Sequence, residues 1–196
     1  MVRSERVIGK GAAMTATLRE ALLESRTGAA GAGGAGRARE GAAGAGRSGP
    51  RGREPVFVLC DGDLAESARE LGPLAAAVSS GECELAVAVF VRRLGGGFGL
   101  AVGFARWAIH ARCGLWSSAP ISGQRALSER ALRDTLPFAD GYGMEMAMTI
   151  DAVRAGHRVK EIELDLSHRA STRTPAGFAH RARQLLDFVR VYLVRR

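Results

Sequence analysis

The chain has 196 residues, and its 46% hydrophobic content is typical of a globular protein with one principal core. Its net charge is +8, but residues 1–55 hold ten Lys/Arg against five Asp/Glu, whereas the rest of the chain holds 18 against 15. Nearly all of the basic residues are Arg, in a chain that is also rich in Ala and Gly. The positive charge by itself is therefore weak evidence for a nucleic-acid partner.

The first predicted element is one amphipathic helix over residues 11–25. Met14, Leu18 and Leu22 recur there at helical spacing, and we expect Gly28 to end the helix. Residues 28–53 are mostly Gly and Ala with scattered Arg and contain no large apolar side chain. Such a composition buries too little surface to offset its ordering entropy, so we expect a disordered insertion over residues 28–54.

After the insertion, predicted strands alternate with predicted helices. Two short apolar runs, residues 56–60 and 84–91, and the alternating run 158–166 are typical of strands. Helices are expected at five places: 66–79 with an interruption near Gly72, 97–113, 126–135, 144–156 and 175–193. This alternation predicts an α/β fold, a Rossmann-type sheet with helices on both faces.

The cysteines and the N-terminus bear on the compartment. Cys60, Cys83 and Cys113 lie far apart without a CxxC pair, which argues against zinc and disulfides and favours a reducing cytoplasm. The N-terminus lacks the apolar core of a signal peptide. The most apolar stretch, residues 94–109, is shorter than the roughly 20 residues of a membrane span and contains Arg106. We expect a cytoplasmic protein, with contact to the inner face of the membrane as an open alternative.

Two carboxylates directly follow the strand at residues 56–60. Asp61 and Asp63 are two residues apart, so at a strand end their side chains point the same way, about 7 Å apart. A hard divalent cation would relieve their repulsion and bring phosphate oxygens with it. Alternatively, both residues serve as turn and helix-cap residues before the next helix.

Five segments in this order resemble family 2 glycosyltransferases of the GT-A fold. They are GKGAAM at residue 9, VFVLCDGDL at 56, PISGQRAL at 120, GYGMEMAMTIDAVRAGHRV at 141 and DLSHR at 165. The resemblance is greatest to the bacterial branch around dolichyl-phosphate sugar transferases and glucosyl-3-phosphoglycerate synthases. It implies transfer of a sugar from a UDP- or GDP-linked donor to a phosphorylated or polyprenyl-phosphate acceptor.

The resemblance also implies a donor site with Mg²⁺ or Mn²⁺. Asp61 would lie near the ribose and the metal, Asp63 would be a metal ligand, and His168 would complete the site. Lys10 would reach the nucleotide or its phosphates, with Gly9 and Gly11 allowing close approach. A solvated lysine before a helix and a hydrogen-bonded loop histidine are the alternatives.

On the acceptor side, the resemblance implies a carboxylate base and a polar loop. Glu145 or Asp140 would be the base of an inverting enzyme, although a first-turn Glu is also favoured by the helix dipole. The remaining acceptor-binding candidates are Ser122, Gly123, Gln124, Arg125 and Arg169. Arg125 would bind an acceptor phosphate, with plain solvation of the arginines as the rival interpretation.

The sequence departs from the family at its start. The apolar strand that opens the nucleotide-binding half of family members has no counterpart before Val7, so we expect the first strand or strands to be lacking. Residues 1–27 then form a remnant of that half, and residues 55–196 form the catalytic core and acceptor-side half. The alternative functions are an inactive fragment and a non-catalytic binding protein with a basic tail. A homodimer and a peripheral membrane contact stay open, and no nucleic acid is expected.

Overall fold

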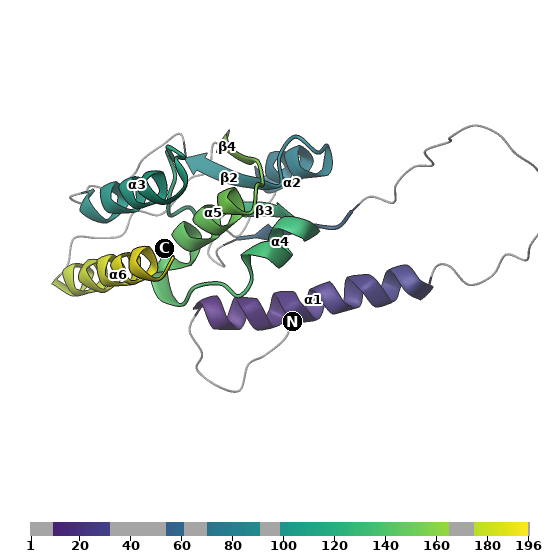
Figure 1. Cartoon of the computed structure of the whole chain (residues 1–196), viewed down its shortest axis with the longest axis horizontal. Coiled ribbons are helices and arrows are strands. Elements are labelled where there is room, and N and C mark those ends of the chain that lie inside the picture. The colour runs from purple at the N-terminus through teal and green to yellow at the C-terminus, as the bar shows by residue number, and fades with distance from the viewer. Residues whose placement is uncertain (1–9, 32–53, 61–69, 91–98, 165–174, 196) are drawn as a thin grey trace, which may run out of the picture.

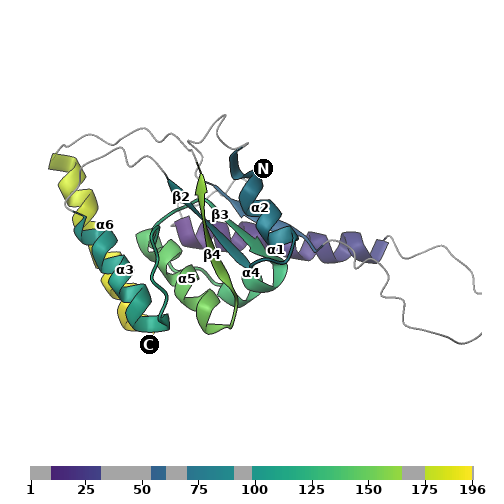
Figure 2. The same cartoon turned by 90° about the horizontal axis from the view of Figure 1, so that it is seen from above.

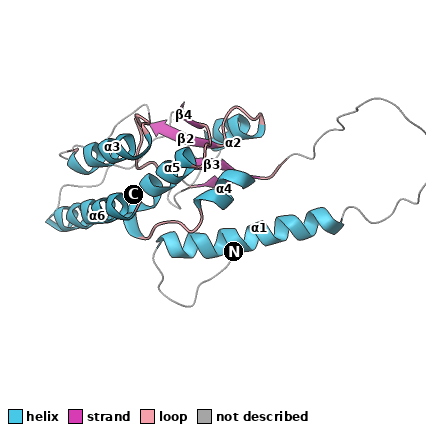
Figure 3. Cartoon of the chain, viewed as in Figure 1, coloured by secondary structure: helices cyan, strands magenta, loops and turns pink. Residues whose placement is uncertain are grey.

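The structure of the chain is a computed structural model that describes residues 10–31, 54–60, 70–90, 99–164 and 175–195. Helices and strands alternate along these residues (Figures 1 and 3). The elements are α1 (Lys10–Gly31), β1 (Val56–Leu59), α2 (Gly72–Ser79), β2 (Leu85–Phe90), α3 (Leu100–Cys113), β3 (Arg125–Ser128), α4 (Glu129–Thr135), a 3-10 turn (Gly141–Gly143), α5 (Met144–Arg154), β4 (Val159–Leu164) and α6 (Pro175–Val194).

The four strands form one mixed sheet in the order β1-β3-β2-β4. β3 lies between β1 and β2 and is antiparallel to both, with Arg125 opposite Leu59 on one side and Val87 on the other. β2 and β4 are parallel, and their last residues, Phe90 and Leu164, are paired. β1, β2 and β4 therefore run in one direction and end at the same edge of the sheet.

Helix α2 covers one face of this sheet. Leu74 and Val78 of α2 pack with Ala86 and Ala88 of β2 in one buried cluster. Gly72 and Pro73 begin this helix, since Pro is favoured in a first turn, where its missing N–H has no partner to lose. Residues 66–69 of the helix expected over 66–79 lie outside the described residues. The Ala side chains of β2 are small, which lets the helix lie close to the strand.

Helices α1, α4 and α5 cover the other face, and α5 is buried on two sides. Met144, Met148 and Ala152, four residues apart, join the sheet-side cluster. Met146 and Ile150 pack instead with α3 and α6, which form an outer layer behind α5 (Figure 2). The predicted α/β class with helices on both faces of the sheet is confirmed.

Two expected elements differ from the structure. Helix α1 continues through Gly28 to Gly31, because Ala-rich sequence sustains a helix and one Gly costs only about 1 kcal/mol. Residues 126–128, expected to be helical, belong to strand β3, and the helix begins one residue later with Ser128 as its cap, accepting from Ala131 N at 3.2 Å. The rest of the expected insertion, residues 32–53, lies outside the described residues, and its disorder stays a prediction.

The cysteines and the helix lengths complete the description of the fold. All three cysteines are free, with Cys60 exposed, Cys83 buried and Cys113 between the two. Within the described parts of the chain, no helix combines the length and the apolar character that crossing a membrane requires.

Candidate functional site

The site is the edge of the sheet at which β1, β2 and β4 end. Leu59, Phe90 and Leu164 are the last residues of these strands. Because β3 runs the opposite way, its first residue, Arg125, lies at this edge as well, opposite Leu59. Ligands of open α/β sheets bind outside the carboxyl ends of the strands. The topology thus brings to one edge the last described residues before the DGD segment, the end of β4 and the residues before β3.

Part of the predicted site lies outside the described residues. This holds for Gly9, Asp61, Asp63, His168 and Arg169. Lys10 is described only as the first residue of α1. The described residues contain no group of three or more His, Cys, Asp or Glu that could hold a metal ion. The roles expected of these six residues therefore stay predictions.

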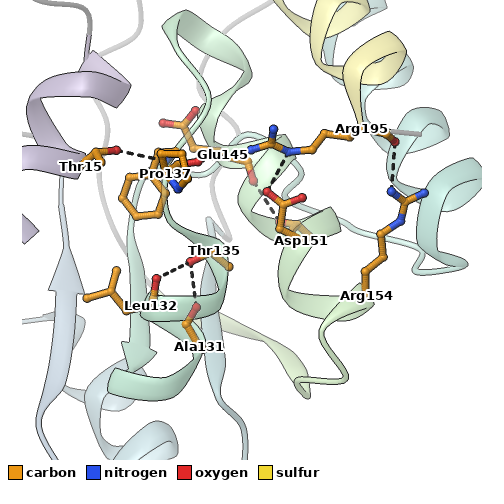
Figure 4. Close-up of polar contacts among 11 residues, drawn as sticks. Thr15, Ala131, Leu132, Thr135, Pro137, Glu145, Asp151, Arg154 and Arg195 are labelled. Carbon is orange, nitrogen blue, oxygen red and sulfur yellow. Dashed lines mark hydrogen bonds and ion pairs between the residues drawn. The ribbon is translucent and has the colours of Figure 1, made fainter. Parts of the chain in front are cut away.

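Gly11 brings the start of α1 against the turn that carries Asp140. A Cβ at Gly11 would lie 2.0 Å from the carbonyl oxygen of Ala139 and 3.2 Å from Cα of Asp140. One turn further along α1, Thr15 Oγ1 accepts a hydrogen bond from Phe138 N at 3.0 Å, and Figure 4 shows Thr15 beside the segment that follows Pro137. At Gly11, the close approach is thus to the chain's own backbone. The start of α1, predicted to bind the donor, therefore lies beside Asp140, a predicted catalytic carboxylate.

We call residues 138–143 the aspartate turn, and α6 holds its second half. Asp187 accepts a hydrogen bond from Tyr142 N at 3.0 Å. Gly141 has φ +68°, and a Cβ there would lie 2.2 Å from Asp187 Oδ2, so the turn requires glycine. A Cβ at Gly143 would lie 2.4 Å from Cγ2 of Val191. Asp187 was not predicted as a site residue from the sequence, although it is the only acidic residue in the basic helix α6.

The C-terminal end of the described chain ties Pro137, the residue before this turn, to α5. Arg195 Nε donates to Asp151 Oδ2 at 2.8 Å, and its Nη2 donates to the Pro137 carbonyl at 3.5 Å (Figure 4). Burial raises the pKa of Asp151, and the attraction of Arg195 opposes that rise. Arg154 Nη1 donates in turn to the Arg195 carbonyl at 3.2 Å.

The two predicted catalytic carboxylates differ in exposure. Asp140 is exposed and caps the 3-10 turn without a side-chain hydrogen bond of its own to that turn. Glu145 is only 6% exposed and lies in the first turn of α5, where the helix dipole favours a negative charge. It also attracts the buried guanidinium of Arg125. Asp140 is thus the carboxylate that an acceptor could reach in this conformation.

Arg125 lies inside the protein and not on its surface. Its side chain is 1% exposed, and its Nε donates to the Ser122 carbonyl at 2.8 Å, its Nη1 to Thr149 Oγ1 at 2.9 Å and its Nη2 to the Pro120 carbonyl at 3.5 Å. Burial lowers its pKa to about 10, against the attraction of Glu145 and Glu161, so it stays charged at neutral pH. This geometry corrects the expectation that Arg125 binds an acceptor phosphate: the guanidinium holds the backbone of the preceding loop.

We call residues 117–124 the serine loop, and a second charge holds its start. Glu161 of β4 accepts from Ser117 Oγ at 2.6 Å, Ser118 N at 2.9 Å and Ala119 N at 3.1 Å. Burial alone would raise the pKa of Glu161, but these hydrogen bonds lower it. Sequence alternation placed Glu161 on a strand without indicating this contact, 42 residues away from Ala119.

The predicted acceptor residues of the serine loop are mostly turned inward. Ser122 and Gln124 are buried, and Ser122 Oγ donates weakly to Gln124 Oε1 at 3.4 Å. Gly123 between them is partly exposed. The Gln124 carbonyl accepts from Ala88 N at 3.0 Å, which extends the pairing of β2. An acceptor at this loop would meet Gly123 and backbone groups before the two side chains.

No family model and no curated protein sequence matches the chain. Solved structures do match: glucosyl-3-phosphoglycerate synthase from Mycobacterium tuberculosis, at 26% identity and a TM-score of 0.53. The same enzyme matches in complex with Mn²⁺, UDP-glucose and phosphoglyceric acid, and in complex with phosphoglyceric acid, each at 25% identity and a TM-score of 0.53. Each alignment covers 71% of this chain and 49% of that enzyme, so the chain spans about half the length of the structures it matches. The resemblance to GT-A glycosyltransferases is thereby confirmed: over the aligned residues, the chain has their fold.

Proposed function

We propose that this chain forms the acceptor-side part of a metal-dependent glycosyltransferase, which moves a sugar from a nucleotide-sugar donor to a phosphorylated acceptor. One observation carries the proposal: at the edge where three strands end, Arg125 donates to Thr149 of α5, and the aspartate turn that leads into α5 packs against the start of α1. The matched enzyme has been solved with Mn²⁺, UDP-glucose and phosphoglyceric acid, which supports this chemistry for the chain.

The spacing along the chain allows a shared metal site. β1 and β4 are separated by three strand spacings, about 14 Å in all. His168 follows Leu164 by four residues, and an extended chain of four residues reaches about 13 Å. Asp63 follows Leu59 by four residues as well, so the two segments are long enough to meet. Two carboxylates and an imidazole suit Mn²⁺, which would polarise the leaving nucleotide diphosphate.

The protein's own groups would bind and orient the substrates around that edge. The N-terminus of α1, with Lys10, carries positive charge that favours the donor phosphates. Asp140, exposed beside Gly11, would accept the proton of the acceptor hydroxyl. Glu145, buried beside the charge of Arg125, would orient the start of α5 and has the weaker claim to the base.

The decisive experiment is calorimetric binding of UDP and of GDP to the full chain with and without Mn²⁺. We expect metal-dependent binding of one nucleotide and its loss in the double variant Asp61→Ala, Asp63→Ala. Glu82→Ala is a matched control, because Glu82 precedes β2 at the opposite edge of the sheet and forms an exposed ion pair with Lys160. Circular dichroism of each variant checks the fold.

Three results would count against the proposal. Nucleotide binding without the metal, or a loss of binding in Glu82→Ala equal to that in the double variant, would argue against a metal site at Asp61 and Asp63. If a folded chain bound neither nucleotide, the chain would keep the fold without a donor site, and the inactive-fragment interpretation would hold. Salt-sensitive binding of nucleic acid that disappears when residues 28–53 are deleted would support the binding protein instead.

A further inference from the structure

The outer surface of α3 and α6 exposes large apolar side chains. Nine large hydrophobic residues are exposed in the described part of the chain, and five of them lie on these two helices. Their exposed fractions are 72% for Leu100, 69% for Val194, 67% for Leu186, 52% for Leu193 and 49% for Trp107. Single exposed apolar residues are ordinary on protein surfaces, but a group of them on neighbouring helices indicates an interaction site.

These side chains form one continuous strip across both helices. Leu100, Phe104 and Trp107 follow a helical i, i+4, i+7 spacing on α3. The rings of Phe104 and Trp107 lie 6.2 and 5.0 Å from the ring of Tyr192 on α6. On α6 the strip continues through Leu186, Val189, Tyr192 and Leu193. Val189 lies three residues after Leu186, three before Tyr192 and four before Leu193, so the four share one side of the helix. We call the strip the outer face; it consists of Leu100, Phe104, Trp107, Leu186, Val189, Tyr192 and Leu193.

Arginines border the outer face, two of them exposed and one partly buried. Arg183 and Arg190 stand three residues before and four residues after Leu186 on α6, so both lie on its side of the helix. Arg112 of α3 stacks over the Tyr192 ring, with its guanidinium carbon 3.9 Å from the ring centre. An aromatic and aliphatic strip with arginines along it has the composition of a surface that rests in the headgroup region of a membrane.

In the sequence of residues 55–196, the excess of positive charge falls on the same two helices. Residues 55–196 hold 18 Lys/Arg and 15 Asp/Glu, of which α3 and α6 contribute five Arg and one Asp. Outside the two helices, 13 basic residues therefore face 14 acidic ones. The positive excess of residues 55–196 in the sequence is therefore carried by the two helices that expose these apolar side chains. Such a surface complements a negatively charged partner and repels a second copy of itself.

We propose that the outer face docks the protein reversibly on the surface of an anionic phospholipid membrane. α3 and α6 lie side by side as the outermost layer, with α5 between them and the sheet (Figures 1 and 2). Figure 2 also shows the N-terminal ends of both helices on the side on which β2 and β4 end. Docking through these helices brings the candidate site to the membrane surface. The proposal stands on the outer face itself and does not depend on sugar transfer.

The test is co-sedimentation of the full chain with vesicles of phosphatidylcholine alone and of phosphatidylcholine with phosphatidylglycerol, at low and high salt, with no nucleotide present. We expect binding to the anionic vesicles that weakens as salt rises. Arg183→Gln with Arg190→Gln should weaken it about 25-fold, about fivefold for each arginine removed. Arg19→Gln, an exposed arginine on α1, is the matched control and should leave binding unchanged.

The apolar part of the proposal has its own matched pair. Leu186→Ser should release most of the protein from the vesicles, whereas Leu23→Ser, at a leucine of α1 with 64% exposure against 67%, should not. Trp107 supplies a direct reading, because the chain has two tryptophans and Trp116→Phe leaves only Trp107. Its fluorescence should shift to the blue when anionic vesicles are added.

Three outcomes would overturn the proposal. Failure of the folded protein to bind either kind of vesicle, or an equal loss in Leu186→Ser and Leu23→Ser, would show that the outer face does not meet lipid. A concentration-dependent dimer in light scattering that Leu186→Ser abolishes, without vesicle binding, would instead assign the outer face to contact between copies of the chain.

Discussion

The serine loop and the aspartate turn lie beside the same edge of the sheet and are held by different forces. Two charges hold the serine loop: the partly buried Glu161 accepts hydrogen bonds at its start, and the buried Arg125 donates hydrogen bonds to its end. Close packing holds the aspartate turn, with Gly11 against its first half and Gly143 against α6. Only the aspartate turn presents an exposed charged side chain, that of Asp140, to the site. In the serine loop, charged side chains of neighbouring strands support the backbone.

The largest effect should come from removing Arg125. Arg125→Ala leaves Thr149 Oγ1 and the carbonyls of Ser122 and Pro120 without their donor inside the protein. The free energy of unfolding should fall by about 3 kcal/mol. Chemical denaturation measures it, with Arg133→Ala as the control, because Arg133 forms an exposed pair with Glu129 worth about 0.5 kcal/mol. Equal losses of unfolding free energy in the two variants would show that Arg125 does not stabilise the fold, and would favour the acceptor-binding role that the sequence suggested.

A smaller effect is expected at Gly11. Gly11→Ala forces a methyl group against the Ala139 carbonyl, and overpacking against backbone atoms costs about 1–3 kcal/mol. Gly103→Ala is the opposite case, because no atom lies within 4 Å of a Cβ there and Ala is the better helix former by about 1 kcal/mol. Thermal unfolding should therefore show a lower midpoint for the first variant and a higher one for the second. A higher midpoint in both would mean that α1 does not pack on the aspartate turn.

The sequence predicted the elements whose patterns are long or strongly apolar. β1, β2 and β4 were found from apolar runs and alternation, and α5 from its spacing and from Gly156 after its end. β3 was missed because it has only four residues and begins with an arginine, which ordinarily lies at the surface. Its position in the middle of the sheet comes from pairing with two strands that are distant in the sequence, which no local pattern reports.

The same limit explains the candidate site. Sequence order brought Asp140 and Glu145 into one segment, but only the fold shows that one is exposed and the other buried. Asp187 and Glu161 act on backbone N–H groups more than 40 residues away, and a carboxylate in a helix or strand pattern carries no sign of such a partner. Expectations for Asp61, Asp63 and His168 rest on the resemblance and on the length of chain that links them to described strands.

The smallest effect, and the one that separates support from binding in the serine loop, should come from Glu161→Gln. The hydrogen bonds from Ser117, Ser118 and Ala119 are stronger to a carboxylate than to an amide, so stability at neutral pH should fall by about 1 kcal/mol, reduced by solvent at this partly exposed group. The folded-state pKa of Glu161 lies below its ordinary 4.5, so its contribution is complete above that pH and disappears as the pH falls through the lowered value.

Unfolding curves between neutral and acid pH should therefore converge for the wild type and Glu161→Gln at low pH and separate above it. Glu163→Gln, an exposed carboxylate two residues along β4, removes the same charge without touching the serine loop and is the matched control. If the difference in stability between the wild type and Glu161→Gln stayed constant at all pH values, the carboxylate of Glu161 would not be the group that anchors Ser117 and Ser118. If they converged as expected while nucleotide binding stayed intact, Glu161 would hold the loop without contributing to the donor site.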